Sequence, residues 1–185
     1  LEDDFVPSAE PSDAQLQAAE QKHAKLVEVL NTCNEEEFMT EKRSAKREAL
    51  LKQWFQALTQ YANMSVSEDT VLEKQDDLLQ ACRQALRSSS PREQYAACRV
   101  VESLAVLVAN EYVQDQIETH LTRILSSSHR ATPVRVAALR ALGMAVLMGV
   151  EDDQVSEATL DLCEALMQSE FKGDAVPASV RAAAV

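Results

Sequence analysis

The sequence predicts an all-α protein, because its composition favours helices and its apolar residues recur with helical spacing. Of the 185 residues, 46% are apolar but only 4% are aromatic, and there are 3 glycines. Strands and tight turns need β-branched, aromatic and glycine residues, whereas Ala, Leu, Gln, Glu and Arg, which dominate here, form helices. A chain of this length is expected to be one compact unit or one stretch of a repeat array, stable without a metal or a disulfide.

Eight helices are expected, each marked by apolar residues at intervals of three and four. They begin near Ser12, Ser44, Ser67, Pro91, Glu111, Val134, Val155 and Pro177. The residues expected to face inward are Leu16, Leu26, Val29, Leu30, Leu50, Leu51, Trp54, Leu58, Tyr61, Leu72, Leu79, Cys82, Leu86, Ala97, Val100, Leu104, Leu107, Val108, Ile117, Leu121 and Ile124.

The N-terminal segment and the segment Val134–Val150 differ from the other parts of the sequence. Residues 1–13 are acidic and contain two prolines, so they are expected to be a flexible lead-in to a repeat domain that covers residues 14–185. The segment Val134–Val150 is apolar nearly all round and should be the most buried helix. It contains two arginines and is too short to cross a membrane.

Three segments resemble one another, and they predict a repeat. Leu86–Arg99, Leu125–Arg140 and Pro177–Val185 each place a Pro, an Arg and a pair of small residues in order, and Ser44–Lys52 is an earlier copy without the Pro. The prolines are 42 and 44 residues apart, within the period of HEAT and armadillo repeats. Each Pro would start the second helix of a hairpin, and the small pair would let that helix approach its neighbours closely. We therefore expect a HEAT/armadillo-like α-solenoid of about four helical hairpins.

Charge and cysteine content narrow the possible partners and the compartment. The net charge of -12 disfavours a general nucleic-acid binder, but the acids concentrate in Leu1–Thr40 and Glu151–Asp174, whereas Glu41–Lys52 and Pro133–Val150 are locally positive. Contact with a nucleic-acid-rich partner is thereby confined to the positive stretches.

The start of the sequence has no signal-peptide pattern. Four cysteines lack any CxxC pair and are expected to be small buried apolar residues in a reducing compartment; they are Cys33, Cys82, Cys98 and Cys163.

Enzyme signatures are missing from the sequence, which contains no HExxH, no GxSxG and no nucleotide loop. We expect a non-enzymatic protein without a cofactor, a metal or a small-molecule substrate. His129 follows Ser126–Ser128, a pattern better explained by a turn between helices than by a catalytic pair. Glu35–Glu37 and Glu151–Asp153 are expected to be solvated faces or helix starts.

Two sets of basic residues occupy matching places in the repeats. Arg47, Arg135 and Arg181 form one set, and Lys52, Arg99 and Arg140 form the other. Equivalent positions of stacked repeats line up, so these cations could form a ridge that meets phosphate or an acidic partner, or they could make ion pairs between repeats. The candidate partner-binding residues are Lys42, Arg43, Lys46, Arg47, Lys52, Arg99, Arg135 and Arg140.

The adjacent aromatic residues Trp54 and Phe55 point in different directions on a helix, so one of the two could be an exposed anchor. Trp54 is expected in the core.

The repeat segments resemble the interferon-related developmental regulator family. The likeness is carried by Ser44–Lys52, Arg92–Val100 and Pro133–Gly143, and most of all by Arg-Ala-Leu-Gly at 140–143 followed by an apolar helix and the acidic turn Glu151–Asp153. It covers about Leu16 to Val185, which corresponds to the family's N-terminal repeat region, and we expect the family's C-terminal conserved region to lie outside this chain.

The resemblance implies a non-enzymatic regulator that associates with ribosomes, including translationally idle ones, and a second role as a transcriptional co-regulator with deacetylase corepressors. It thus implies a cytoplasmic location, and a nuclear one for the second role. Two hypotheses follow: a ribosome-bound regulator whose basic ridge touches rRNA or a ribosomal protein, and a scaffold that binds only proteins. Neither requires a membrane.

Overall fold

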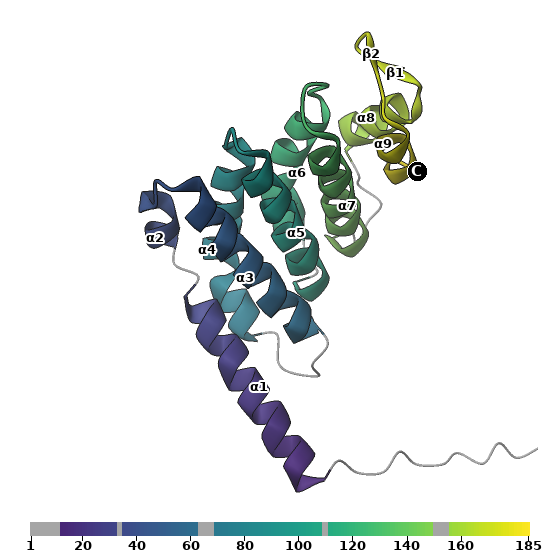
Figure 1. Ribbon diagram of the computed structural model, residues 1–185. Coiled ribbons are helices and arrows are strands. Elements are labelled where there is room, and N and C mark those ends of the chain that lie inside the picture. The colour runs from purple at the N-terminus through teal and green to yellow at the C-terminus, as the bar shows by residue number, and fades with distance from the viewer. Residues whose placement is uncertain (1–11, 33–34, 63–68, 109–110, 150–155) are drawn as a thin grey trace, which may run out of the picture.

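The computed structural model describes residues 12–32, 35–62, 69–108, 111–149 and 156–185. Within these residues every regular element is a helix except for one short hairpin (Figure 1), so the predicted all-α class is confirmed. The elements are α1 (Asp13–Asn31), α2 (Glu35–Thr40), α3 (Ser44–Ala62), α4 (Asp69–Arg87), α5 (Pro91–Leu107), α6 (Glu111–Leu125), α7 (Thr132–Gly149), α8 (Glu157–Met167), β1 (Glu170–Phe171), β2 (Asp174–Ala175) and α9 (Ala178–Ala183).

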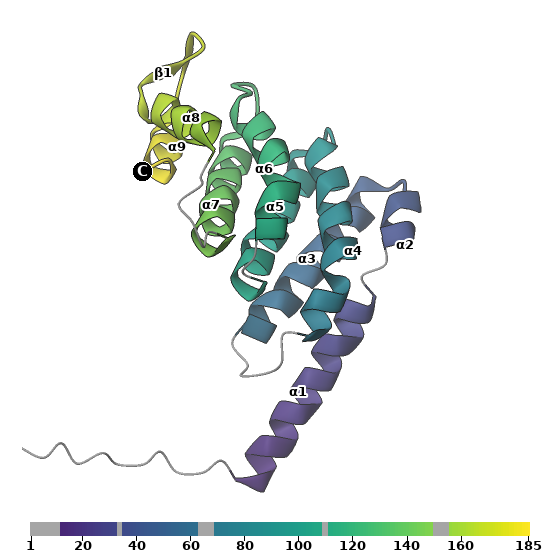
Figure 2. The ribbon, with the colours of Figure 1, turned by 180° about the vertical axis from the view of Figure 1, so that it is seen from behind.

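The helices pack in two rows that run side by side. In one row α3 packs on α5, α5 on α7 and α7 on α9; in the other α2 packs on α4, α4 on α6 and α6 on α8. The rows are joined because α4 packs on α5, α6 on α7 and α8 on α9. Figure 1 is seen from the side of α3, α5 and α7, and Figure 2 from the side of α4, α6 and α8. This order of packing is compatible with the predicted stack of helical hairpins.

Small side chains allow the second helices of the hairpins to approach one another. The predicted pairs Ala96–Ala97 in α5 and Ala137–Ala138 in α7 are all buried. Larger residues fill the space between the rows, among them Leu78, Leu104 and Ile117, which are fully buried. The core is therefore continuous along the stack.

The start of α5 follows the predicted pattern of a serine cap and a proline in the first turn. Ser90 is the N-cap, its Oγ accepts a hydrogen bond from the backbone N–H of Glu93 at 3.4 Å, and Pro91 is the first helical residue. The proline fits because its fixed φ suits the first turn, where no intrahelical N–H bond is lost.

Replacing Ser90 with alanine is expected to lower the free energy of unfolding by about 1 kcal/mol, because the N–H of Glu93 loses its cap. Urea denaturation followed by circular dichroism measures the loss. Ser89→Ala is the matched control, since Ser89 is exposed and caps nothing; a change within about 0.5 kcal/mol is expected there. Equal losses in the two variants would contradict the role of the cap.

Most predicted inward residues are buried, but Val29, Leu50 and Leu107 are only partly buried, and Leu16 and Leu72 are exposed. Leu16 is 49% exposed because the first half of α1 extends away from the other helices (Figure 1). Leu72 is 45% exposed because the inward face of α4 is set by Val71 and Leu78, and Leu72 lies a third of a turn away. The helix α7, which was expected to be the most buried, has an exposed face, on which Leu147 is 73% exposed.

The sequence did not indicate two of the elements, and it placed several helix starts one or two residues from those observed. It did not predict α2 or the hairpin of β1 and β2, which are too short to show a periodic pattern. Lys172 and Gly173 make the hairpin turn with φ of 52° and 82°, as a two-residue turn of type I′ requires. Thr132 is already helical, two residues before the expected start at Val134, and Pro177 is the N-cap of α9 rather than its first residue.

Several expectations concern residues outside the described part of the chain. These include residues 1–11 of the lead-in, Cys33 and Glu151–Asp153, together with the side chain of Tyr61. The expected helix start near Ser12 is confirmed, because Ser12 is the N-cap of α1 and forms a capping box with Gln15.

Candidate functional site

The first matched set of cations faces the protein interior. Arg47 on α3 makes a two-pronged ion pair with Glu93 on α5: Nη2 is 3.0 Å from Oε1 and Nε is 3.1 Å from Oε2. The side chain of Glu93 is fully buried and that of Arg47 is 17% exposed. Arg47 Nη1 also donates to the backbone carbonyl of Glu41 at 2.6 Å. Arg47 therefore joins neighbouring repeats, which is the ion-pair alternative that the sequence left open.

Arg135 is also unavailable to a partner, whereas Arg181 is partly exposed. Arg135 is only 2% exposed, and its Nε and Nη2 have no hydrogen-bond partner. Burial lowers the pKa of Arg135. Arg181 Nη1 donates to the backbone carbonyl of Val176 at 2.9 Å. The prediction that Arg47 and Arg135 belong to an exposed ridge is wrong, because this position of the repeat points between the helices.

The second matched set lies on the surface and forms a row across three helices. Lys52 on α3 and Arg99 on α5 line one hollow, and Arg99 and Arg140 on α7 line the next. We call Lys52, Arg99 and Arg140 the second-helix row. The structure thus brings together three of the eight predicted residues in the order that the repeat pattern indicated.

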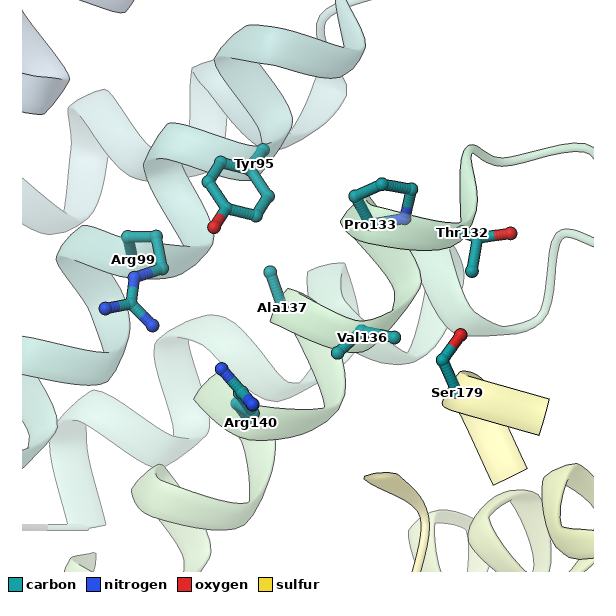
Figure 3. Close-up of a pocket in the computed structure, with 8 residues that line it drawn as sticks. All are labelled: Tyr95, Arg99, Thr132, Pro133, Val136, Ala137, Arg140 and Ser179. Atoms are coloured by element: carbon teal, nitrogen blue, oxygen red, sulfur yellow. The ribbon is translucent and has the colours of Figure 1, made fainter. Parts of the chain in front are cut away.

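The hollow between Arg99 and Arg140 has a volume of about 300 Å³. Figure 3 shows Tyr95 and Arg99 on one helix, opposite Ala137 and Arg140 on the next, with Ser179 of α9 at the far end. Its apolar walls and its two guanidinium groups suit a ligand that carries both an anionic group and a flat or apolar group. The remaining lining residues are Thr132, Pro133 and Val136.

The three cations of the second-helix row differ in how far they are neutralised. Lys52 Nζ is 2.5 Å from Glu48 Oε1, and Arg99 Nη1 is 2.8 Å from Glu102 Oε2. The Arg99 guanidinium also lies 4.7 Å from the centre of the Phe55 ring. Arg140 is exposed and makes neither a hydrogen bond nor an ion pair with any described residue. Arg140 is thus the member of the row whose charge is most available.

The basic segment before α3 forms a separate group around one carboxylate. Arg43 Nε is 3.1 Å and Lys46 Nζ 3.6 Å from the carboxylate of Glu41, and Lys42 is exposed. The hydrogen bond from the Arg43 side chain is the main reason that the pKa of Glu41 falls to about 2. None of these cations lines the two hollows of the second-helix row.

Two aromatic residues lie beside the second-helix row. Tyr95 is 42% exposed and lines both hollows, and Phe55 is half-buried beneath Arg99. Trp54 is buried in the core, as expected. Tyr95 was not selected from the sequence, although its position four residues before Arg99 places the two on one helix face.

Cysteine thiols and a serine–histidine run are the groups of the described residues that chemistry could use. Cys82 and Cys98 are buried thiols, as predicted, and burial raises the pKa of Cys98 to about 12, while Cys163 is only partly buried. Ser126–Ser128 and His129 lie in the turn between α6 and α7. Across the described ranges no His, Cys, Asp and Glu side chains gather as a metal site would need.

A helix that crosses a membrane must be long and apolar. None of the described helices is sufficiently long and apolar to cross a bilayer.

Comparison with known proteins identifies the family. No curated protein and no solved structure matches the chain significantly. The sequence profile described as interferon-related developmental regulator (IFRD) matches residues 3–185, which is nearly the whole chain. The repeat segments that suggested this resemblance lie within α3, α5 and α7 and include the three residues of the second-helix row. The chain belongs to the interferon-related developmental regulator family.

Proposed function

We propose that this chain is a non-enzymatic, ribosome-associated regulator of translation that binds idle ribosomes through the second-helix row. Family membership supports the proposal, and the observation that carries it is the exposed Arg140 beside Arg99 and Tyr95 in one hollow. In this proposal the two rows of helices act as a HEAT-like solenoid, whose equivalent positions present the three cations in line.

The chemistry of the row suits ribosomal RNA. A guanidinium fork matches the oxygens of a phosphate, and an exposed tyrosine ring offers a stacking surface for a base. Arg140 and Tyr95 supply these two groups on adjacent helices. The acidic side chains Glu48 and Glu102 compete for Lys52 and Arg99, so RNA contact at this row should be strongest at Arg140.

A protein-only scaffold, for example in transcriptional co-regulation, is the second candidate. It is favoured by the same neutralisation of Lys52 and Arg99 and by the apolar walls that Pro133 and Val136 give to the hollow. A peptide with one acidic and one apolar side chain would fit this surface. The first role places the protein in the cytoplasm and the second also in the nucleus.

The double variant Lys52→Glu/Arg140→Glu is expected to lose affinity for ribosomes by about tenfold or more, because two favourable charge contacts become repulsive. Gradient sedimentation with salt-washed ribosomes that carry no mRNA, at low and at high salt, measures the bound fraction. Lys22→Glu/Lys25→Glu changes the net charge equally on the exposed part of α1 and should leave the bound fraction unchanged.

Two outcomes would contradict ribosome binding through the row. The first is that the parent chain stays out of the ribosomal fractions at low salt. The second is that the row variant, Lys52→Glu/Arg140→Glu, sediments with ribosomes as the parent does. If the row variant keeps ribosome binding but loses a protein partner, the scaffold is the correct function.

A further inference from the structure

The opposite row of helices carries a second cluster of cations. Arg83 and Arg87 lie one turn apart on α4, and His120 and Arg123 lie one turn apart on α6, which packs against α4. Burial, together with the charges of Arg87, Arg83 and Arg123, lowers the pKa of His120, so the charges of all three arginines act on this one imidazole. We call these four residues the α4–α6 patch; the helices that carry it are seen from their exposed side in Figure 2.

No described carboxylate compensates the charges of this patch. The hydrogen bond that Arg83 Nη1 makes is donated to the neutral side chain of Gln116, and Arg83 Nε is buried without a partner. Neither Arg87 nor Arg123 forms an ion pair with any residue that the structure describes.

Two acidic residues of the same helices are engaged elsewhere. Asp77 on α4 pairs with Lys74. Glu118 on α6 accepts hydrogen bonds from Ser156 and Thr159 at the start of α8. In a protein of net charge -12, three arginines that form no ion pair with any described carboxylate mark a site for an outside anion.

Helix dipoles explain only part of the patch. Arg87 and Arg123 lie in the last turns of α4 and α6, where a positive charge is favourable. Arg83 lies a full turn earlier on α4, and its guanidinium is held toward α6 by Gln116. Its position and its buried, unpartnered Nε are therefore not accounted for by the dipoles.

The composition of the patch selects the kind of anion. Guanidinium groups bind phosphate oxygens in a two-pronged geometry. The exposed large apolar side chains of the described chain lie outside the patch, on other helices or at Leu72 at the far end of α4. A protein partner would need an apolar anchor, and single-stranded RNA would need an exposed stacking ring, whereas the one ring of the patch, that of His120, is partly buried. A double-helical RNA backbone therefore fits best.

We propose that Arg83, Arg87, His120 and Arg123 form a second contact site, which binds the phosphate backbone of double-helical RNA. The site lies on the opposite row of helices from the second-helix row, so the protein could hold two RNA segments, or an RNA and a protein, at once. The choice of RNA as the polyanion rests on the proposed ribosomal function, whereas the choice of phosphate rests on the patch itself.

The test uses the purified chain and a fluorescently labelled RNA hairpin, with binding followed by anisotropy over a series of salt concentrations. Arg87→Glu/Arg123→Glu is expected to raise Kd tenfold or more at low salt. The slope of log K against log salt should fall by about 2, because two phosphate contacts are lost. Both substituted arginines are exposed at helix ends, so folding should be retained.

Two further variants serve as controls for this test. Arg87→Gln/Arg123→Gln removes the charges without reversing them and should reduce the slope equally, which keeps the test valid if the reversed variant fails to fold. Lys25→Glu/Arg92→Glu changes the net charge as much as the reversed variant, at exposed positions of α1 and α5, and should leave the slope unchanged. The proposal is overturned if the patch variants and this control bind the hairpin alike.

A competitor distinguishes the two kinds of polyanion. Polyglutamate at equal charge concentration should displace the hairpin poorly, because carboxylates without an apolar anchor bind the patch weakly. Displacement as effective as that by unlabelled hairpin would identify an acidic protein segment as the ligand and overturn the RNA assignment. Hairpin binding that depends on the patch can persist when ribosome sedimentation fails, so failure of the two proposals can be told apart.

Discussion

Removing the carboxylate of Glu93 is expected to destabilise the protein by about 3 kcal/mol, since Glu93→Ala leaves the guanidinium of Arg47 largely buried and unpaired. Two charge-assisted hydrogen bonds join these residues, and Glu93 is fully buried between α3 and α5. A buried charge that loses its partner keeps its desolvation cost, which is why the loss exceeds that of a surface ion pair. Urea denaturation followed by circular dichroism measures it.

The control for Glu93→Ala is Lys52→Ala, which breaks the exposed ion pair with Glu48 and should cost about 0.5 kcal/mol. Replacing both partners, as in Arg47→Met/Glu93→Leu, should recover most of the stability, because no charge is then left buried. A double variant no more stable than Glu93→Ala would show that the loss has another cause.

The contribution of Glu93 should also depend on pH. Burial alone would raise the pKa of Glu93, but hydrogen bonds from Arg47, Ser44 and Ser88 outweigh it and hold the pKa below its ordinary value. A carboxyl with a lower pKa in the folded state stabilises the fold above its unfolded pKa, and this stabilisation is lost as the pH falls through the folded pKa. The difference between parent and Glu93→Ala should therefore shrink below about pH 4.

The second large effect is expected in the core, where Trp54→Ala should cost about 4 kcal/mol of unfolding free energy. Trp54 is 1% exposed, and its ring centre lies 5.5 Å from that of Phe38, which is fully buried. This pair joins α3 to α2, so its loss removes both apolar contact and the packing of the short helix. Because Trp54 is the single tryptophan, denaturation of this variant has to be followed by circular dichroism.

Two substitutions separate volume from polarity at this site. The Nε1 of Trp54 is buried without a hydrogen-bond partner, so Trp54→Phe loses no hydrogen bond and should cost about half as much as Trp54→Ala. Phe55→Ala, on the adjacent and half-buried ring, should cost less than Trp54→Ala. If Phe55→Ala costs as much as Trp54→Ala, the core does not lie where the structure places it.

Local signals in the sequence were sufficient for most helices. The pair Ser90–Pro91 marks the start of α5, and the periodic apolar residues of α6 predict its limits at Glu111 and Leu125, as observed. These signals act within one helix, through caps and side-chain spacing, so they can be read without knowledge of the neighbours. Short elements such as α2 give no such pattern.

The candidate site was predicted only in part, because burial depends on neighbouring helices. The repeat pattern correctly indicated that Lys52, Arg99 and Arg140 lie in line on the surface. The same pattern could not show that Arg47 meets Glu93, which is 46 residues away. The α4–α6 patch was missed because Arg83 and Arg123 belong to two helices that come together only in the folded chain.

The sequence by itself determined the helical class, the repeat and the equivalence of positions between repeats, since all three follow from spacing along one chain. Which cations face a partner and which hold the repeats together was decided by the tertiary structure. Arg135 and Arg140 illustrate the difference: they lie five residues apart on α7, and one is buried while the other is exposed. The physical reason is that a helix position is buried or exposed according to the helices packed against it, and that packing is not encoded in local spacing.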